Sequence, residues 1–109
     1  MKKKDQLQGT LDLLILKSLW SRGPMHGYAI ASHIQQVSDE TLRVEEGSLY
    51  PALHRLEADG WISAAWTVSA TKRRVKVYRL TVPGRRQVAL AERRWNELTR
   101  AIGKVLRFA

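Results

Sequence analysis

The chain has 109 residues, of which 44% are hydrophobic and 27% are charged, a balance typical of one domain with one modest core. Nineteen Lys and Arg against ten Asp and Glu give a net charge of +9, which favours a polyanionic partner such as nucleic acid or an anionic membrane surface. The chain lacks cysteine, which excludes disulfides and thiolate chemistry. Because it shows neither a signal-peptide cleavage site nor an apolar run of the roughly 20 residues that span a membrane, we expect a cytoplasmic protein.

The first part of the chain predicts two helices separated by a turn. The first is a leucine-rich helix that should be buried on most sides, because its apolar stripe is wide. Its apolar positions are Leu7, Leu11, Leu13, Leu14, Ile15, Leu16, Leu19 and Trp20. The stretch SRGPMHG ends this helix, and His26 is expected to cap or pack near the turn. A second helix then runs to about Ser38, with Ile30, Ile34 and Val37 on one face.

A third helix is predicted after the polar connection SDETLRVEEGS. Its apolar stripe, at positions i, i+3, i+4 and i+7, consists of Leu49, Ala52, Leu53 and Leu56. Pro51 has no N–H group and is tolerated best in a first helical turn, so we place the start near Gly47 or Ser48, with Ser48 as N-cap. The Asp-Gly pair at 59–60 ends the helix.

The hydrophobic period then changes from that of a helix to that of a strand. Apolar and polar residues alternate over two runs, at 61–68 and 74–81. Between the alternating segments lies the basic stretch SATKRR, so the pattern predicts a β-hairpin with a positive tip. Its loop contains neither Gly nor Asn, and the turn type stays undetermined.

A last helix is predicted from the stretch TVPG onward, with Thr81 as its N-cap. Its apolar residues follow one another at intervals of 3, 4, 3, 4 and 3, which is the heptad seam of a helix that pairs with another helix. The seam consists of Val88, Ala91, Trp95, Leu98, Ile102 and Val105. No other segment of the chain is long enough to pair with it, so we predict a two-fold homodimer with these residues at its interface.

Three helices, a basic hairpin and a long helix are the elements of a winged helix-turn-helix in their usual order. The sequence therefore predicts a mainly α fold with a small β-hairpin. It has a winged helix-turn-helix DNA-binding domain at 1–82 and a C-terminal dimerisation helix at 83–109, in one compact unit. In that architecture the third helix enters the DNA major groove and the hairpin, or wing, touches the flanking backbone. Gly47 and Ser48 would permit close approach of a phosphate to the helix N-terminus.

The stretch EEGSLYPALHRLEADGWI resembles the PadR family of bacterial transcriptional regulators, together with LLIL and GPMHGYAI before it and RRVKVYRLT after it. The resemblance runs from about Gly9 to Trp95, and short members with one C-terminal helix are the most similar. It implies a homodimer that represses promoters and, in many members, releases DNA on binding a small molecule. One departure is Lys72, which stands before the arginine pair where family wings often carry a glycine.

These features together select the residues expected to contact double-stranded DNA. They are Tyr28, Gly47, Ser48, Tyr50, Pro51, His54 and Arg55 on the helices, and Lys72, Arg73 and Arg74 on the wing. Glu45 and Glu46 are unfavourable for phosphate, so they either read a cytosine amino group or face water. Trp95 is dimer core by its seam position, and it also matches a tryptophan on which drug-sensing members of the family stack planar ligands.

The best-supported function is a homodimeric repressor that binds a pseudo-palindromic operator. The alternative is a winged-helix module for RNA or protein, although a protein-binding wing would more often expose apolar residues than TKRR. A membrane-surface role would need a basic amphipathic helix; the last helix is one, but its narrow seam suits a partner helix better. No enzyme motif is present, and His26, His33 and His54 match no zinc pattern, so no catalytic residue, metal or cofactor is expected.

Overall fold

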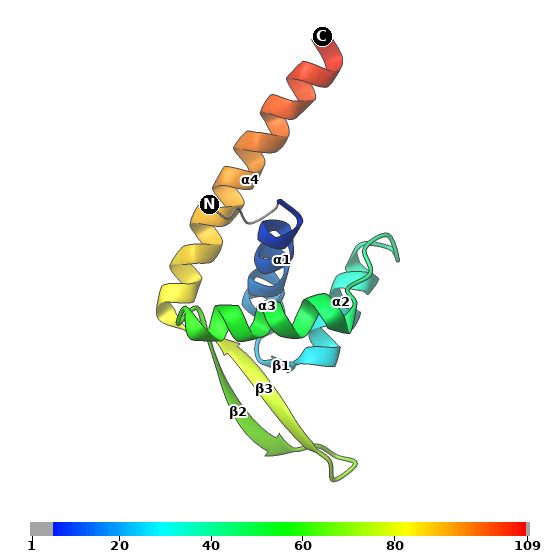
Figure 1. The fold of residues 1–109 in the computed structure, drawn as a ribbon, viewed down its shortest axis with the longest axis vertical. Helices are drawn as coiled ribbons and strands as arrows, with labels where there is room; N and C mark the ends of the chain where they lie inside the picture. The colour runs from blue at the N-terminus through cyan, green and yellow to red at the C-terminus, as the bar shows by residue number, and fades with distance from the viewer. Residues whose placement is uncertain (1–5, 109) are drawn as a thin grey trace.

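The computed structural model of the chain describes residues 6–108, with side chains from residue 9 onward, so Leu7 of the expected apolar stripe lies outside the described side chains. The elements, in order, are α1 (Gln6–Arg22), β1 (Met25–His26), α2 (Gly27–Val37), α3 (Glu46–Ala58), β2 (Ile62–Val68), β3 (Arg74–Leu80) and α4 (Val82–Phe108). Figure 1 shows a body of α1, α2 and α3 from which the β2–β3 hairpin and α4 extend in opposite directions. Within residues 6–108, no helix is both long enough and apolar enough to cross a membrane.

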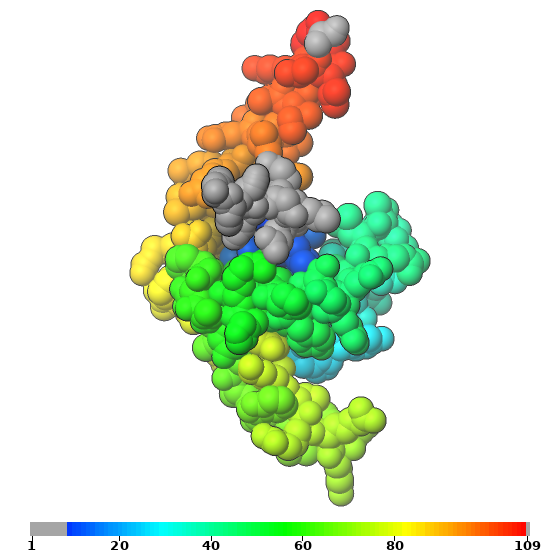
Figure 2. All heavy atoms as spheres, in the orientation of Figure 1, coloured from blue at the N-terminus to red at the C-terminus, as the bar shows by residue number. Residues whose placement is uncertain are grey.

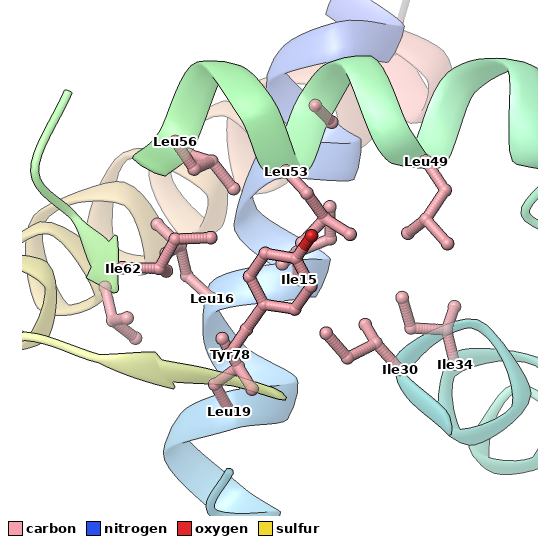
Figure 3. Close-up of a cluster of buried hydrophobic side chains, with 12 residues drawn as sticks. Ile15, Leu16, Leu19, Ile30, Ile34, Leu49, Leu53, Leu56, Ile62 and Tyr78 are labelled. Carbon is pink, nitrogen blue, oxygen red and sulfur yellow. The ribbon is translucent and has the colours of Figure 1, made fainter. Parts of the chain in front are cut away.

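The core lies where α1, α2 and α3 meet the base of the hairpin, as Figure 3 shows. Its buried residues are Ile15, Leu16, Leu19, Ile30, Ile34, Leu49, Ala52, Leu53, Leu56, Ile62, Tyr78 and Val88. Two apolar positions that were predicted to be buried are exposed. Trp20 is 43% exposed, with the cations of Lys17 and Arg85 over its ring, and Val37 is 66% exposed because no further helical turn follows it in α2.

The start of α3 differs from the prediction. Glu45 is the N-cap and the helix begins at Glu46, so Ser48 lies inside the first turn, where its N–H donates to the Glu45 carbonyl at 3.0 Å. Pro51 therefore lies in the second turn, where it cannot donate to the carbonyl of Gly47. The proline is tolerated because both residues are exposed, and water can bond that carbonyl. The predicted end at Asp-Gly is confirmed.

The hairpin is confirmed, and it belongs to a sheet of three antiparallel strands in the order β1-β3-β2. Strands β2 and β3 pair without interruption from Ile62–Leu80 to Val68–Arg74. The two-residue strand β1, which the sequence did not predict, pairs with the other edge of β3. At the hairpin tip Lys72 has a φ of 64°, so the turn places a left-handed residue where a glycine would be unstrained. Residues 62–80 are called the wing below.

The start of α4 is fixed to the body by backbone contacts. The Thr81 hydroxyl oxygen accepts a hydrogen bond from the N–H of Gly84 at 3.0 Å, which confirms Thr81 as the cap, and its O–H donates to the Gly60 carbonyl at 2.7 Å. Gly84 packs so closely against the carbonyl oxygen of Trp61 that a Cβ there would overlap it. Glu92 of α4 is paired with Lys17 of α1, and the C-terminal part of α4 extends away from the body (Figure 1). Residues 93–108 are called the arm below.

Candidate nucleic-acid interface

One side of α3 packs on the core and the opposite side faces outward. Four of the residues expected to contact DNA are exposed on this outward side: Gly47, Tyr50, Pro51 and His54. They are related by steps of three, four and seven residues, which share one face of a helix. The side chain of the N-cap residue Glu45 makes no capping hydrogen bond, so its carboxylate does not cover the N–H groups at the start of α3. An uncapped helix N-terminus with small residues beside it is suited to an anion such as phosphate.

Ser48 and Arg55 lie on a flank of α3 instead, toward α1. The Arg55 guanidinium donates to a carboxylate oxygen of Asp12 at 2.6 Å, and both side chains are about one-quarter exposed. The Nε of Arg55 is buried and has no hydrogen-bond partner within the part of the chain that the structure describes. Ser48 lines a shallow apolar pocket of 250 Å³ beside Leu11 and Leu14. The structure thus does not bring Arg55 together with the outward residues; it joins α3 to α1.

The start of α2 lies beside the start of α3. The Nδ1 of His26 accepts a hydrogen bond from the N–H of Ala29 at 3.2 Å, which confirms its capping role. The next residue but one, Tyr28, is 71% exposed. Tyr50 packs its ring and hydroxyl against Gly27, where an added Cβ would lie 2.9 Å from them. Tyr28 and Tyr50 therefore lie on the same surface, where the start of α2 meets the first turns of α3.

The wing carries the cations that the sequence assigned to DNA. Lys72, Arg73 and Arg74 are all exposed at its tip, which Figure 2 shows as a narrow projection below the body. Glu45 and Glu46 are also exposed, at the start of α3. The acidic pair thus lies beside the helix N-terminus, while the basic residues lie on the wing.

Two wing residues that the sequence reasoning missed lie on the surface that faces the helices. Trp66 of β2 is 58% exposed, and the Arg74 guanidinium carbon lies 4.8 Å from its ring centroid. Lys76, which is paired with Trp66 across the hairpin, donates to the Glu57 carboxylate of α3 at 3.3 Å. The sequence could have indicated these two residues through the register of the predicted hairpin. Pairing the two alternating runs places the ring of Trp66 opposite the cation of Lys76.

An open pocket with a volume of about 420 Å³ lies between the wing and the starts of α2 and α3. It is called the wing–helix pocket below. Residues that line it include His26, Tyr28, Tyr50, Trp66, Arg74 and Lys76. Tyr78 also lines it, and burial raises the pKa of its hydroxyl, an effect that the neighbouring Lys76 partly opposes. The phenol therefore stays protonated at neutral pH and can donate a hydrogen bond.

The seam of α4 changes from buried to exposed along its length. Val88 is 1% exposed and Ala91 is half-buried against the body. The remaining seam residues, all on the arm, are 40 to 62% exposed: Trp95, Leu98, Ile102 and Val105. The body therefore covers only the first part of the predicted interface, and a continuous apolar row is left open on the arm.

Comparison with known proteins gives matches over most of the chain. Residues 15–90 match the model of the transcriptional regulator PadR-like family. Transcriptional regulator Rv3488 of Mycobacterium tuberculosis is 41% identical over 68 residues, which are 62% of this chain and 63% of that protein. The negative transcriptional regulator PadR of Bacillus subtilis is 29% identical over 70 residues, which are 64% of this chain and 38% of that protein. The chain thus spans less than two thirds of the length of either relative.

Among solved structures, a transcriptional regulator from Clostridium thermocellum is similar to this chain over nearly its whole length. The TM-score is 0.82 at 32% sequence identity, and the match covers 93% of this chain and 97% of that one. The similarity thus includes the three-helix body, the wing and most of α4.

Proposed function

Because the chain belongs to the PadR-like family of transcriptional regulators, we propose that it is a homodimeric repressor that binds duplex DNA at a specific operator. Its fold is the winged helix of that family, and, like its relatives, it is a regulator of transcription and not an enzyme. Its place of action is then the compartment that holds the DNA, which in a bacterial cell is the cytoplasm.

The observation that carries this proposal is the exposed outward face of α3 beside a wing with three exposed cations. In this arrangement α3 enters the major groove while the wing follows the flanking backbone. Gly47 and Pro51 present little side-chain bulk, so the helix comes close to the bases, and His54 reads a base edge. Lys72, Arg73 and Arg74 pair with phosphates, which positions the protein without reading sequence.

The remaining predicted contacts take different roles in this proposal. Tyr28 and Tyr50 donate hydrogen bonds to backbone phosphates from the N-terminal ends of α2 and α3. Ser48 lies at the edge of the outward face and contacts the backbone or a base there. Arg55 acts indirectly: its ion pair with Asp12 fixes the angle of α3 on α1.

Dimerisation through residues 83–109 is supported by the exposed apolar row on the arm. A partner helix with the same heptad pattern would cover Trp95, Leu98, Ile102 and Val105. A two-fold dimer of this kind presents residues 1–82 of each copy, and the operator would be pseudo-palindromic, with half-site centres about 10 bp or a multiple apart. Repression is supported by the name of the Bacillus subtilis relative, a negative transcriptional regulator.

Trp95 supports a second element of the proposal, a planar apolar effector at the dimer interface. Its ring is 42% exposed and Ala91, one turn earlier, leaves room beside it. Release of DNA would follow if the effector prefers a dimer whose α3 helices are wrongly spaced for the operator. Titration with planar dyes should quench tryptophan fluorescence in the native protein and not in Trp95→Ala. Equal quenching of both proteins would exclude an effector site at Trp95. It would not bear on the proposal that the protein binds DNA.

The experiment that tests the main proposal is selection of bound sequences from random duplex DNA. We expect a pseudo-palindrome to emerge. Selection with His54→Ala should change the preferred bases, while Asn96→Ala on the arm, the matched control, should return the native sequence. If the native protein enriches no duplex at all, the alternative of an RNA-binding or protein-binding module replaces this proposal.

A further inference from the structure

Two of the exposed tryptophans, Trp20 and Trp66, each lie beside two cations. Trp20 of α1 has the Nζ of Lys17 at 5.5 Å and the guanidinium of Arg85 at 5.4 Å from its ring centroid. Trp66 of the wing has Arg74 at 4.8 Å and Lys76 Nζ at 6.0 Å. The two sites have the same chemistry, but only Trp66 is part of the wing–helix pocket. Trp20 therefore serves as the comparison for Trp66: both rings contact cations, but only the ring of Trp66 lines this pocket.

The two cations beside Trp66 differ in what else they contact. Lys76 is bonded to the Glu57 carboxylate, so its charge is largely compensated and it attaches the wing to α3. Arg74 is exposed and has no carboxylate partner among the described residues. The ring of Trp66 holds this uncompensated guanidinium at the mouth of the pocket, because a cation over an aromatic ring is attracted by the electrons of the ring face. The pocket thus combines an apolar wall with an ordered positive charge.

That combination matches the chemistry of one nucleotide unit of the DNA backbone. The apolar face of a deoxyribose fits against an indole ring, and its phosphate pairs with a guanidinium in bidentate geometry. The pocket volume of 420 Å³ lies toward the lower end of the range for sites that hold one small ligand, which suits a single unit. Tyr28 and Tyr50 line the same pocket, and a phenol hydroxyl is a further donor of the kind that a phosphate needs.

We propose that the wing–helix pocket binds one sugar–phosphate unit of the operator backbone, with the deoxyribose against Trp66 and the phosphate on Arg74. Trp66 is then both a DNA contact and the residue that positions Arg74. This inference rests on the proposed function, because it requires that α3 and the wing engage one duplex together. The pocket is lined both by Tyr50 of α3 and by Arg74 of the wing, so it joins the two parts that the proposed function places on the duplex.

The test measures affinity for the selected duplex as a function of salt, for native protein and for Trp66→Ala, Arg74→Ala and the double variant. Trp66→Ala should weaken binding about three- to fivefold on every duplex. It should also reduce the slope of log affinity against log salt in the direction of Arg74→Ala, whose own slope falls by about 0.9. The double variant should bind somewhat less tightly than Arg74→Ala, because it also loses the sugar contact of the ring. Its loss should be smaller than the two single losses combined, because part of the effect of the ring acts through Arg74. Trp66→Phe should retain most of the affinity, since it keeps an aromatic face.

Trp20→Ala is the matched control, because it removes the same ring from between two cations outside the pocket. Its DNA affinity should equal that of the native protein. Thermal unfolding of every variant shows that the fold is kept, as expected for exposed rings.

A second measurement locates the phosphate. A neutral methylphosphonate is placed at each backbone position of the duplex in turn. At one of the sensitive positions in each half-site, it should weaken binding of the native protein and leave binding of Arg74→Ala unchanged. Native affinity in Trp66→Ala, or additive effects in the double variant, would overturn the inference while DNA binding itself stands. If the native protein binds no duplex, the proposed function and this inference fail together.

Discussion

The wing and the arm both extend from the body, in opposite directions, and both are rich in positive charge (Figure 1). The exposed cations of the wing tip are Lys72, Arg73 and Arg74, and those of the arm are Arg93, Arg94, Arg100, Lys104 and Arg107. They differ in how apolar side chains are placed among the cations. On the wing a single ring lies between cations, whereas on the arm apolar residues recur every three or four positions. Net charge therefore predicts a polyanionic partner only for the wing, and the arm's partner follows from its apolar period.

The largest effect is expected at the joint between the two projections. Gly84→Ala places a Cβ on the backbone carbonyl of Trp61, which joins the base of the wing to the start of α4, so stability should fall by about 3 kcal/mol or more. Gly103→Ala on the arm is the control, because its Cβ meets nothing within 4 Å and should stabilise the helix by up to about 1 kcal/mol. Urea unfolding compares the two variants. If Gly84→Ala and Gly103→Ala unfold at similar urea concentrations, the contact between Gly84 and the Trp61 carbonyl is not rigid.

The second effect concerns the arm alone. Leu98→Glu puts a carboxylate into the proposed helix pair, which should cost several kcal/mol and weaken dimerisation by more than about a hundredfold. Asn96→Glu adds the same charge off the seam and should leave the dimer intact. Sedimentation at micromolar concentration gives the oligomeric state. If the Leu98→Glu protein is still dimeric, the heptad seam is not the dimer interface.

The third effect compares one positive charge on each projection. Arg73→Ala on the wing should lower the slope of log affinity against log salt by about 0.9, as expected for one lost phosphate contact. Arg100→Ala on the arm removes the same charge and should leave the slope nearly unchanged. Fluorescence anisotropy with labelled duplex over a range of salt measures both. Equal changes in slope would show that DNA contacts the arm as well as the wing.

The smallest effect is expected at the wing tip. Lys72 has a φ of 64°, so Lys72→Gly should stabilise the fold by about 1 kcal/mol, while removing one cation from the tip. Arg73→Gly removes the neighbouring cation at a residue without positive φ and should destabilise the wing by roughly 0.5 to 1 kcal/mol. Thermal unfolding distinguishes the two. A destabilised Lys72→Gly protein would mean that the tip has another conformation in solution.

Periodicity predicted which faces of the elements are buried, but not where each face ends. The predicted stripe of α3, which consists of Leu49, Ala52, Leu53 and Leu56, is buried, and so are Ile30 and Ile34 in α2, as predicted. Val37 continues the same spacing and is exposed, because the helical pattern does not indicate where the neighbouring elements stop. The position of Pro51 predicts that α3 starts near Gly47 or Ser48. The helix begins earlier, because an exposed carbonyl can lose its helical partner to water.

Pairings between distant residues could not be predicted from local patterns. Strand β1 has only two residues, too few to show a period, and it forms because β3 offers it a free edge. Asp12 and Arg55 are 43 positions apart, and nothing near either residue indicates the ion pair. The candidate contacts that share a face of α3 were predictable from spacing. The wing–helix pocket was not, because it forms only when the wing packs beside the helices.

The heptad spacing of the arm has a consequence for the length of the operator. In a dimer built on this seam, the next alignment with matched apolar rows is displaced by seven residues, or about 10 Å along the helix axis. A displacement of that size moves one body relative to the other by about 10 Å along the helix axis. In such a dimer the spacing of the two α3 helices would change only in steps of one heptad. Insertion of one or two base pairs at the centre of the proposed operator would then have no compensating alignment of the arms.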